Sequence, residues 1–271
     1  MAITNFIQTV WSEKLLEEMG AKYVGVANCN REFEGEIRQV GDRVKICGVG
    51  NVTIFDYNKN TDMSAAETLD DSCAELVIDR AKAFNFQIDD VDAAQSSPKL
   101  MSAAMTNAAS ALAKEADAYI FSLYGEAGGS VSGNYEEGQF LDLIVDAKTK
   151  IIEAGAPSDC EIVVEVTPKV AAGILKSKIA IATDNEASLE SGYLGSIAGC
   201  RIYVSGNVAV DGGAHHCLVR TKRAIAYAEQ LNEVNAYRPE LRFADAVKGL
   251  HLYGAKVVYP KELIDMSVVI V

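Results

Sequence analysis

Few residues of this chain combine side-chain type and spacing in a way that could do chemistry. His215 and His216 precede Cys217, and imidazole and thiolate groups are the usual ligands of zinc. No fourth ligand lies at a recognisable zinc-site spacing, and adjacent residues of a strand point to opposite faces of a sheet. These three residues are therefore not predicted to form a metal site.

Three further patterns resemble functional loops but lack essential parts. The acidic cluster Asp89, Asp90 and Asp92 resembles the start of a calcium-binding loop, but the later glycine and glutamate are missing, so it is predicted to be a turn and a helix cap. Gly195–Gly199 has the wrong spacing for a nucleophile elbow. The glycines from Gly125 to Gly138 lack the ending of a phosphate-binding loop and are predicted to form a flexible linkage.

The six cysteines do not form a recognisable framework. None belongs to a C-x-x-C pair, and their scatter predicts free, mostly buried thiols in a reducing compartment (Cys29, Cys47, Cys73, Cys160, Cys200 and Cys217). With only three histidines, general acid–base chemistry would fall on carboxylates, and none of them stands out. The sequence therefore predicts no catalytic, cofactor-binding or metal-binding residues, no cofactor and no enzyme activity.

Composition excludes several classes of protein. The chain has 271 residues and a formal net charge of −13, which argues against a dedicated nucleic-acid-binding protein. The same charge suits a surface that stays close to DNA without adhering to it. No stretch of 18 or more apolar residues is present, and the first residues do not resemble a secretory signal. We therefore expect a protein of the cytoplasm with no membrane partner.

One long helix is predicted to organise the chain. Ser97 is a favourable N-cap, Pro98 suits a first helical position, and Gly125 is the expected C-terminal cap. A helix from Ser97 to Tyr124 would be roughly 40 Å long. It could be a buried core helix or a rod that supports a flat, extended subunit. Apolar residues recur along it at helical spacing: Met101, Ala104, Met105, Ala108, Leu112, Ala116, Tyr119 and Leu123.

The region before this helix is predicted to be extended. A short helix over Trp11–Met19, ended by Gly20, would dock on its own subunit or on a neighbour. Alternation then predicts strands around Val44 and Ile46, around Val52 and Ile54, and over Phe84–Ile88. The polar piece Tyr57–Asp71 would join two extended arms as a long tip that rests on another subunit.

The region after the helix is predicted to contain a compact α/β unit and returning strands. The unit's helices and strands are expected over Phe140–Glu153, Glu161–Thr167, Pro168–Lys176, Arg201–Ser205 and Cys217–Thr221. Strands then follow over Ala224–Glu229, Val247–Tyr253 and Lys256–Tyr259, with a terminal strand in the last residues. Gly249 and Gly254 are expected to break or bulge these strands.

This order of elements resembles the major capsid proteins of tailed bacteriophages, which have the Hong Kong 97-type fold. The resemblance covers nearly the whole chain as an ordered set, although none of its segments is a strict signature. The segments that carry it are Phe84–Gln95 with Ala113–Asp117, Thr167–Ser177, Gly192–Asn207 and Arg242–Leu263.

The resemblance implies an α+β capsid fold with an N-arm, an extended β-hairpin loop, a long spine helix, and peripheral and axial domains. The N-arm would be residues 1–33 and the extended loop (E-loop) 34–89. The peripheral domain would be 90–125 with 224–271, and the axial domain 126–223. The implied function is self-assembly as hexamers and pentamers into an icosahedral shell that encloses the double-stranded DNA of a tailed phage.

The resemblance also implies partners and a location. The chain itself is the main partner, and a separate scaffolding protein is expected because the arm starts close to Met1. A portal protein, a possible decoration protein and packaged DNA bound without sequence specificity complete the expected partners. The location would be the virion capsid, assembled in the host bacterial cytoplasm. Lys45 and Lys59 lie in the expected loop, but no local motif identifies an asparagine partner, so crosslinking is not predicted.

Two other readings remain open from the sequence. An encapsulin-like protein compartment would share the same fold and differ in what it encloses. An α/β enzyme with an unidentified site is the alternative from another class, and the lack of a coherent catalytic set counts against it.

Overall fold

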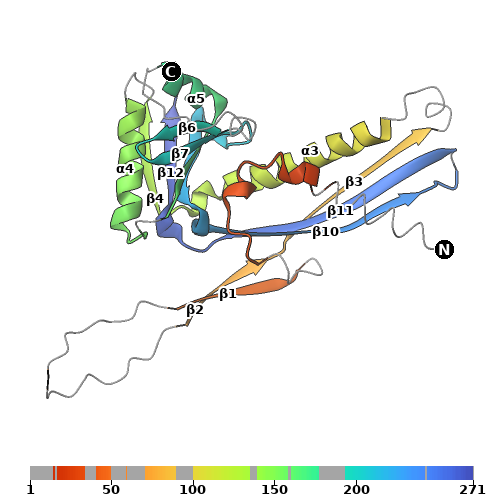
Figure 1. Cartoon of the computed structure of the whole chain (residues 1–271), viewed down its shortest axis with the longest axis horizontal. Helices are drawn as coiled ribbons and strands as arrows, with labels where there is room; N and C mark the ends of the chain where they lie inside the picture. Colours follow the sequence, from red (N-terminus) through yellow and green to blue (C-terminus); the bar gives the residue numbers. More distant parts are fainter. Residues whose placement is uncertain are drawn as a thin grey trace.

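The computed structural model describes residues 15, 17–33, 41–49, 59, 71–89, 100–134, 139–157, 160–176, 193–241 and 243–270. Three parts are visible in Figure 1. A compact unit of sheet and helices lies at one end, a long helix runs beside a long, narrow sheet, and a two-stranded hairpin projects away from both.

The compact unit is built on a seven-stranded sheet with the order β4-β12-β9-β5-β7-β6, and β8 pairs with β9. The helices α4 (Gln139–Glu153) and α5 (Pro168–Lys176) pack their apolar sides on it, as predicted. Gly155 has a φ of 91°, which suits its place just after α4. The strands are β4 (Gly129–Asn134), β5 (Ile162–Val166), β6 (Tyr193–Ile197), β7 (Cys200–Val204), β8 (Val210–Asp211), β9 (Ala214–Thr221) and β12 (Leu263–Val269).

Two strands of this sheet differ from the prediction. β4 lies in the segment that was predicted to be a flexible linkage, and that prediction is wrong because the segment pairs in parallel with β12. β12 falls in the range 224–271 expected for the peripheral domain, yet it lies between β4 and β9 in the compact sheet. Met266, opposite Cys217 of β9 and Val131 of β4, is fully buried there. The end of the chain therefore completes the core of the compact unit.

The long half consists of α3 (Leu100–Ser122) and a three-stranded sheet of β10 (Ile225–Tyr237), β11 (Ala244–Val257) and β3 (Arg80–Asp89). Figure 1 shows the helix running along this sheet. Ala109, Ala113 and Ala116 are buried in the same core cluster as Val247 and Tyr253 of β11. The predicted long helix is confirmed, and it supports the sheet along its length.

The predicted cap of this helix is wrong. Gly125 lies inside the 3-10 turn η2 (Leu123–Glu126), and the extended residue after the turn is Ala127. Gly125 is not among the glycines with positive φ, so it does not form a left-handed cap. Ser97 and Pro98, the predicted start, lie outside the described residues.

β11 runs without a break through both glycines that were expected to interrupt it. A Cβ atom on Gly249 would lie 2.4 Å from the Phe84 ring, and one on Gly254 would lie 2.3 Å from the carbonyl oxygen of Val77. The predicted breaks are therefore wrong. Each glycine instead allows another part of the chain to approach the strand closely.

The projecting hairpin consists of β1 (Arg43–Val49) and β2 (Asp71–Val77), paired antiparallel. β1 was predicted, but β2 was not, because β3 had been taken as the returning arm. β3 lies in the expected loop 34–89, yet it pairs along its whole length with β11. The base of the hairpin has a core: Val44, Ile46, Leu76 and Ile78 pack on Ala226, Ala228 and Leu252. The predicted strand at Val52 and Ile54 lies outside the described residues.

The remaining described elements are short. Leu15 and residues 17–20 are helical, consistent with the predicted helix over Trp11–Met19, although Trp11 lies outside the described residues. Three 3-10 turns complete the fold: η1 (Val26–Asn28), η4 (Lys222–Ala224) and η5 (Pro260–Glu262). Asn30 forms a bridge with Ala226, so the segment after η1 touches the free edge of β10.

Candidate assembly surfaces

The residues singled out for chemistry do not come together in the structure. His216 Nδ1 lies 2.9 Å from Asp265 Oδ2 of β12, and its ring stacks on Tyr124 at 4.0 Å between ring centroids. His215 is its neighbour on β9, where strand alternation turns adjacent side chains to opposite faces. Among the residues that the structure describes, no group of three or more His, Cys, Asp or Glu side chains is placed to hold a metal ion.

The cysteines with described side chains are free thiols. Cys29, Cys200 and Cys217 are buried, as predicted, and Cys160 is half-buried. Burial raises the pKa of Cys29 to about 11 and that of Cys217 to about 12, so both remain protonated and unreactive at neutral pH. The side chains of Cys47 and Cys73 lie outside the described part of the chain, as do Asp90 and Asp92 of the acidic cluster. No described helix is long and apolar enough to cross a membrane.

A buried carboxylate, Glu229 of β10, connects three parts of the long half. It accepts hydrogen bonds from the Tyr23 and Tyr227 hydroxyls, and His251 Nε2 of β11 lies 3.0 Å from its Oε2. Arg31 forms an ion pair with it at 2.6 Å. Burial works to raise the pKa of Glu229, but hydrogen bonds from His251 and Tyr23 outweigh it and hold that pKa below its usual value. This cluster therefore attaches residues 23–31 to the long sheet.

A second buried cluster lies where α3 meets the compact unit. Arg220 of β9 and Glu165 of β5 form an ion pair in which both side chains are fully buried. Asp117 of α3 accepts hydrogen bonds from the backbone N–H groups of Val24 and Val26, each at 3.0 Å. None of these charged residues is distinctive in the sequence, because their charges look like ordinary surface charges until the fold buries them.

Asp117 makes a testable contribution to pH dependence. Burial raises its pKa to about 6, against the lowering effect of hydrogen bonds from Val26 and Val24. The folded state therefore binds a proton on Asp117 at a higher pH than the unfolded state does. We expect this group to make the free energy of unfolding rise, by on the order of 1–3 kcal/mol, as pH falls from about 7 to about 4.

The measurement is urea unfolding of the wild-type chain and of Asp117→Asn at several pH values. The substitution leaves one backbone N–H without an acceptor, so the variant should be less stable at every pH. The stability gap between the two proteins should widen toward acid pH, because only the wild type gains from protonation. A gap that narrows toward acid pH would contradict the assignment.

The hairpin tip between β10 and β11 is the most apolar exposed feature among the described residues. Leu241 is 96% exposed and Phe243 is 82% exposed, and Tyr237 next to them is 38% exposed. Figure 1 shows this tip at the end of the long half farthest from the compact unit. Two large apolar side chains with so little cover are typical of a surface that contacts a partner.

A weaker apolar stripe runs along the outer side of α4. Leu141, Val145 and Ile152 are 37%, 40% and 50% exposed, and Leu175 of α5 is 55% exposed. The opposite side of α4 is buried on the compact sheet through Phe140, Leu143, Ile144, Ala147 and Ile151. The compact unit thus has a second, partly apolar surface far from the tip between β10 and β11.

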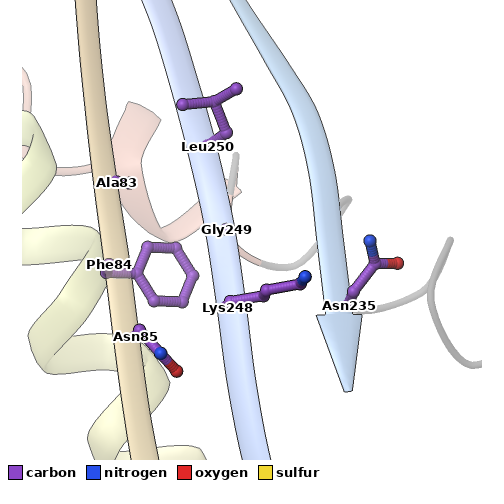
Figure 2. A pocket seen from close by; sticks show the side chains of 7 residues that line it. All are labelled: Ala83, Phe84, Asn85, Asn235, Lys248, Gly249 and Leu250. Carbon is purple, nitrogen blue, oxygen red and sulfur yellow. The ribbon is translucent and has the colours of Figure 1, made fainter. Parts of the chain in front are cut away.

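A shallow groove of about 310 Å³ crosses the long sheet between these surfaces (Figure 2). The Phe84 ring lies toward Gly249, and Lys248 extends toward Asn235 on β10. The Lys248 ammonium group lies 5.4 Å from the centroid of the Tyr237 ring, and the Tyr237 hydroxyl donates to Asn85. These contacts partly close the groove with its own side chains, and it presents no set of groups that could do chemistry.

The fold is similar to that of solved phage structures, although the sequence alone has no match among protein families. No protein-family model and no curated protein matches the sequence. The structure matches a chain from Mycobacterium phage Che8 with a TM-score of 0.69 and 28% identity, covering 90% of this chain and 91% of that one. It matches the capsid of Ralstonia phage GP4 with a TM-score of 0.70 and 12% identity, covering 90% and 87%.

A virus-like particle from Pyrococcus furiosus matches with a TM-score of 0.56 and 12% identity, covering 96% of this chain and 99% of that one. The chain therefore has the α+β, Hong Kong 97-type fold of phage capsid proteins. Its resemblance to the major capsid proteins of tailed phages, predicted from the sequence, is confirmed, and the encapsulin alternative is not better supported.

Proposed function

We propose that this chain is a major capsid protein that assembles as hexamers and pentamers into an icosahedral shell around the double-stranded DNA of a tailed phage. The observation that carries the proposal is the match of about 90% of the chain to phage capsid structures. The role is structural and non-enzymatic. The proposed domains are the ones that the resemblance implies, with β12 assigned to the axial sheet and β3 to the sheet of the peripheral domain.

The shape of the subunit supports assembly. The hairpin of β1 and β2 packs on the body at its base, and a two-stranded hairpin has little stability of its own. Such an element gains its stability when it is covered by a neighbouring subunit, and obligate interfaces bury thousands of Å². Two different apolar surfaces at opposite ends of the subunit suit head-to-tail contacts, which close into rings. Many weak contacts then make a closed shell stable.

The remaining partners belong to the same proposal. A separate scaffolding protein, a portal protein and a possible decoration protein would act with the shell, and assembly would take place in the host bacterial cytoplasm. The net charge of −13 would limit adhesion of packaged DNA to the shell wall.

Electron microscopy of the purified protein tests the proposal. We would express the chain alone and together with the product of a neighbouring gene that is a candidate scaffolding protein. Closed shells of uniform size, or rings and tubes of capsomers, are expected. Shells that contain a specific protein cargo would favour a compartment instead. A stable monomer or small oligomer under both conditions would overturn the proposal.

Deletion of residues 58–70 from the loop between β1 and β2 is expected to separate folding from assembly. The residues described in the core of the hairpin base (Val44, Ile46, Leu76 and Ile78) all lie outside this range, so the subunit should remain soluble and folded. Its assembly should be poor, because the extended loop is proposed to lie on a neighbour. Sedimentation velocity measures the loss of shells, and circular dichroism checks the fold. Normal assembly of the deleted chain would show that the loop assignment is wrong.

A further inference from the structure

Residues 22–31 form a strap that crosses between α3 and both sheets. Lys22 Nζ donates to the carbonyl oxygen of Thr106 in α3, and Asn30 exchanges backbone hydrogen bonds with Ile225 and Tyr227 of β10. Between these two attachments, the backbone of Gly25 and Asn28 contacts the compact sheet. The polar contacts of the strap therefore reach α3, the compact unit and the long sheet together.

We propose that this strap fixes the angle between the compact unit and the long half, and so sets the curvature of the shell. The proposal rests on the proposed capsid function. A shell repeats one subunit many times, so a small change of angle inside the subunit is repeated at every position. A subunit with a fixed angle assembles into shells of one size, and a subunit with a variable angle assembles into many forms.

The contact with the compact unit is made through Arg220. Its Nη2 donates to the carbonyl oxygen of Gly25 at 2.8 Å and its Nη1 to that of Asn28 at 2.7 Å. Its Nε and Nη2 also donate to the two carboxylate oxygens of Glu165, at 2.9 and 2.8 Å. Asn28 Nδ2 donates to Glu165 as well, at 3.2 Å. Hydrogen bonds from a planar guanidinium group are directional, so Arg220 fixes the orientation of the strap relative to β5.

The contact with α3 also restricts the position of the strap. The Asp117 carboxylate accepts from Val24 with one oxygen and from Val26 with the other, so it holds the turn η1 at a single place on the helix. A Cβ atom on Gly25 would lie 3.0 Å from the Phe121 ring and 3.3 Å from Asp117 Oδ1. The strap therefore lies directly against the helix, where a larger side chain would push it away.

The contact with the long sheet uses the Glu229 cluster. Tyr23 and Arg31 approach this carboxylate from the two ends of the strap, while Tyr227 and His251 approach it from the sheet. Both ends of the strap are thus attached to the same side chain. The middle of the strap, held by Arg220, cannot shift along the sheet without breaking one of these attachments.

A buried ion pair such as Arg220–Glu165 is better suited to fixing the relative orientation of two segments than to stabilising the fold. The desolvation of two charges offsets most of their attraction, and apolar replacements of similar volume are often equally stable. An apolar contact, however, tolerates sliding and rotation that a guanidinium group with several hydrogen-bond partners does not. The cost of burying Arg220 and Glu165 is therefore consistent with a role in fixing geometry.

The experiment replaces the pair and measures shell size. We expect the double variant Arg220→Met, Glu165→Leu to fold, as judged by circular dichroism, and to assemble into particles whose diameters are spread at least threefold more widely than in the wild type. The matched control is Arg201→Met with Glu161→Leu, the partly exposed Arg–Glu pair of the same unit, which should leave the size distribution unchanged. Variant shells as uniform as the wild type would overturn the proposal.

A second variant keeps the test decisive if the first does not fold. Arg220→Lys retains the charge beside Glu165, but its single nitrogen carries three donors and cannot reproduce the four hydrogen bonds that the guanidinium makes to Gly25, Asn28 and the two oxygens of Glu165. In the soluble subunit, amide hydrogens of residues 24–30 should then exchange at least tenfold faster, whereas those of α4 should not change. Unchanged exchange would refute the strap whether or not shells form. Failure of the wild-type chain to form shells would instead refute the capsid function alone.

Discussion

The double variant Leu241→Asp, Phe243→Asp is expected to fold normally and to lose the ability to form shells. Both side chains are almost fully exposed in the subunit, and neither belongs to a described core cluster. Their replacement should therefore change the free energy of unfolding by less than about 0.5 kcal/mol. An interface that covers this tip would have to bury two carboxylates, at a cost of several kcal/mol for each contact. Repeated around a shell, that cost should reduce assembly at least a hundredfold.

Sedimentation velocity and electron microscopy measure this loss, and thermal unfolding of the soluble subunit checks the fold. The matched control is Leu241→Met with Phe243→Tyr, which keeps the size and most of the apolar surface of the tip. The control should assemble almost as well as the wild type. Shells of the aspartate variant at wild-type yield would show that the tip is not an assembly surface.

The second large effect is expected from Gly254→Ala. The added methyl group would lie 2.3 Å from the carbonyl oxygen of Val77 and 3.1 Å from the Cα atom of Ile78. Both atoms belong to the backbone, so a rotamer change cannot relieve the contact, and the base of the hairpin must move away from β11. We expect a loss of about 3 kcal/mol in the free energy of unfolding, with faster hydrogen exchange in β1 and β2.

Gly125→Ala is the matched control for this substitution. Gly125 has nothing within 4 Å of an added Cβ atom, and its φ is not positive. Its replacement should change stability little or raise it slightly, because alanine loses less backbone entropy in a helical turn. Equal stability of the two variants would show that the hairpin base does not need the close approach to β11 that Gly254 allows.

The helices were predictable because their signals are local. The apolar spacing and alanine content of α3, the stop at Gly155 after α4, and the proline that opens α5 all lie within the elements they define. The order of these elements was enough to predict the fold, even though no single segment is a signature. The strands β1 and β3 were also predictable from alternation, but their partners were not.

The errors concern contacts between distant segments. β4 contains three small polar residues and two glycines and has no strand pattern of its own, so only pairing with β12 makes it a strand. Gly249 and Gly254 were expected to break a strand, but in the structure they make room for the Phe84 ring and the Val77 carbonyl oxygen. Arg220, Glu165 and Asp117 look like solvated charges until the fold buries all three.

Local signals in the sequence were enough to predict the helices, several strands, the fold class and the absence of any recognisable catalytic motif, because periodicity, caps and motif spacing act over a few residues. The tertiary structure alone decided which strands pair, which glycines are contact points and which charges are buried. It also showed that residues 22–31 join α3 to both sheets. Those features depend on segments up to about 200 residues apart, such as Gly25 and Arg220, whose meeting no local pattern specifies.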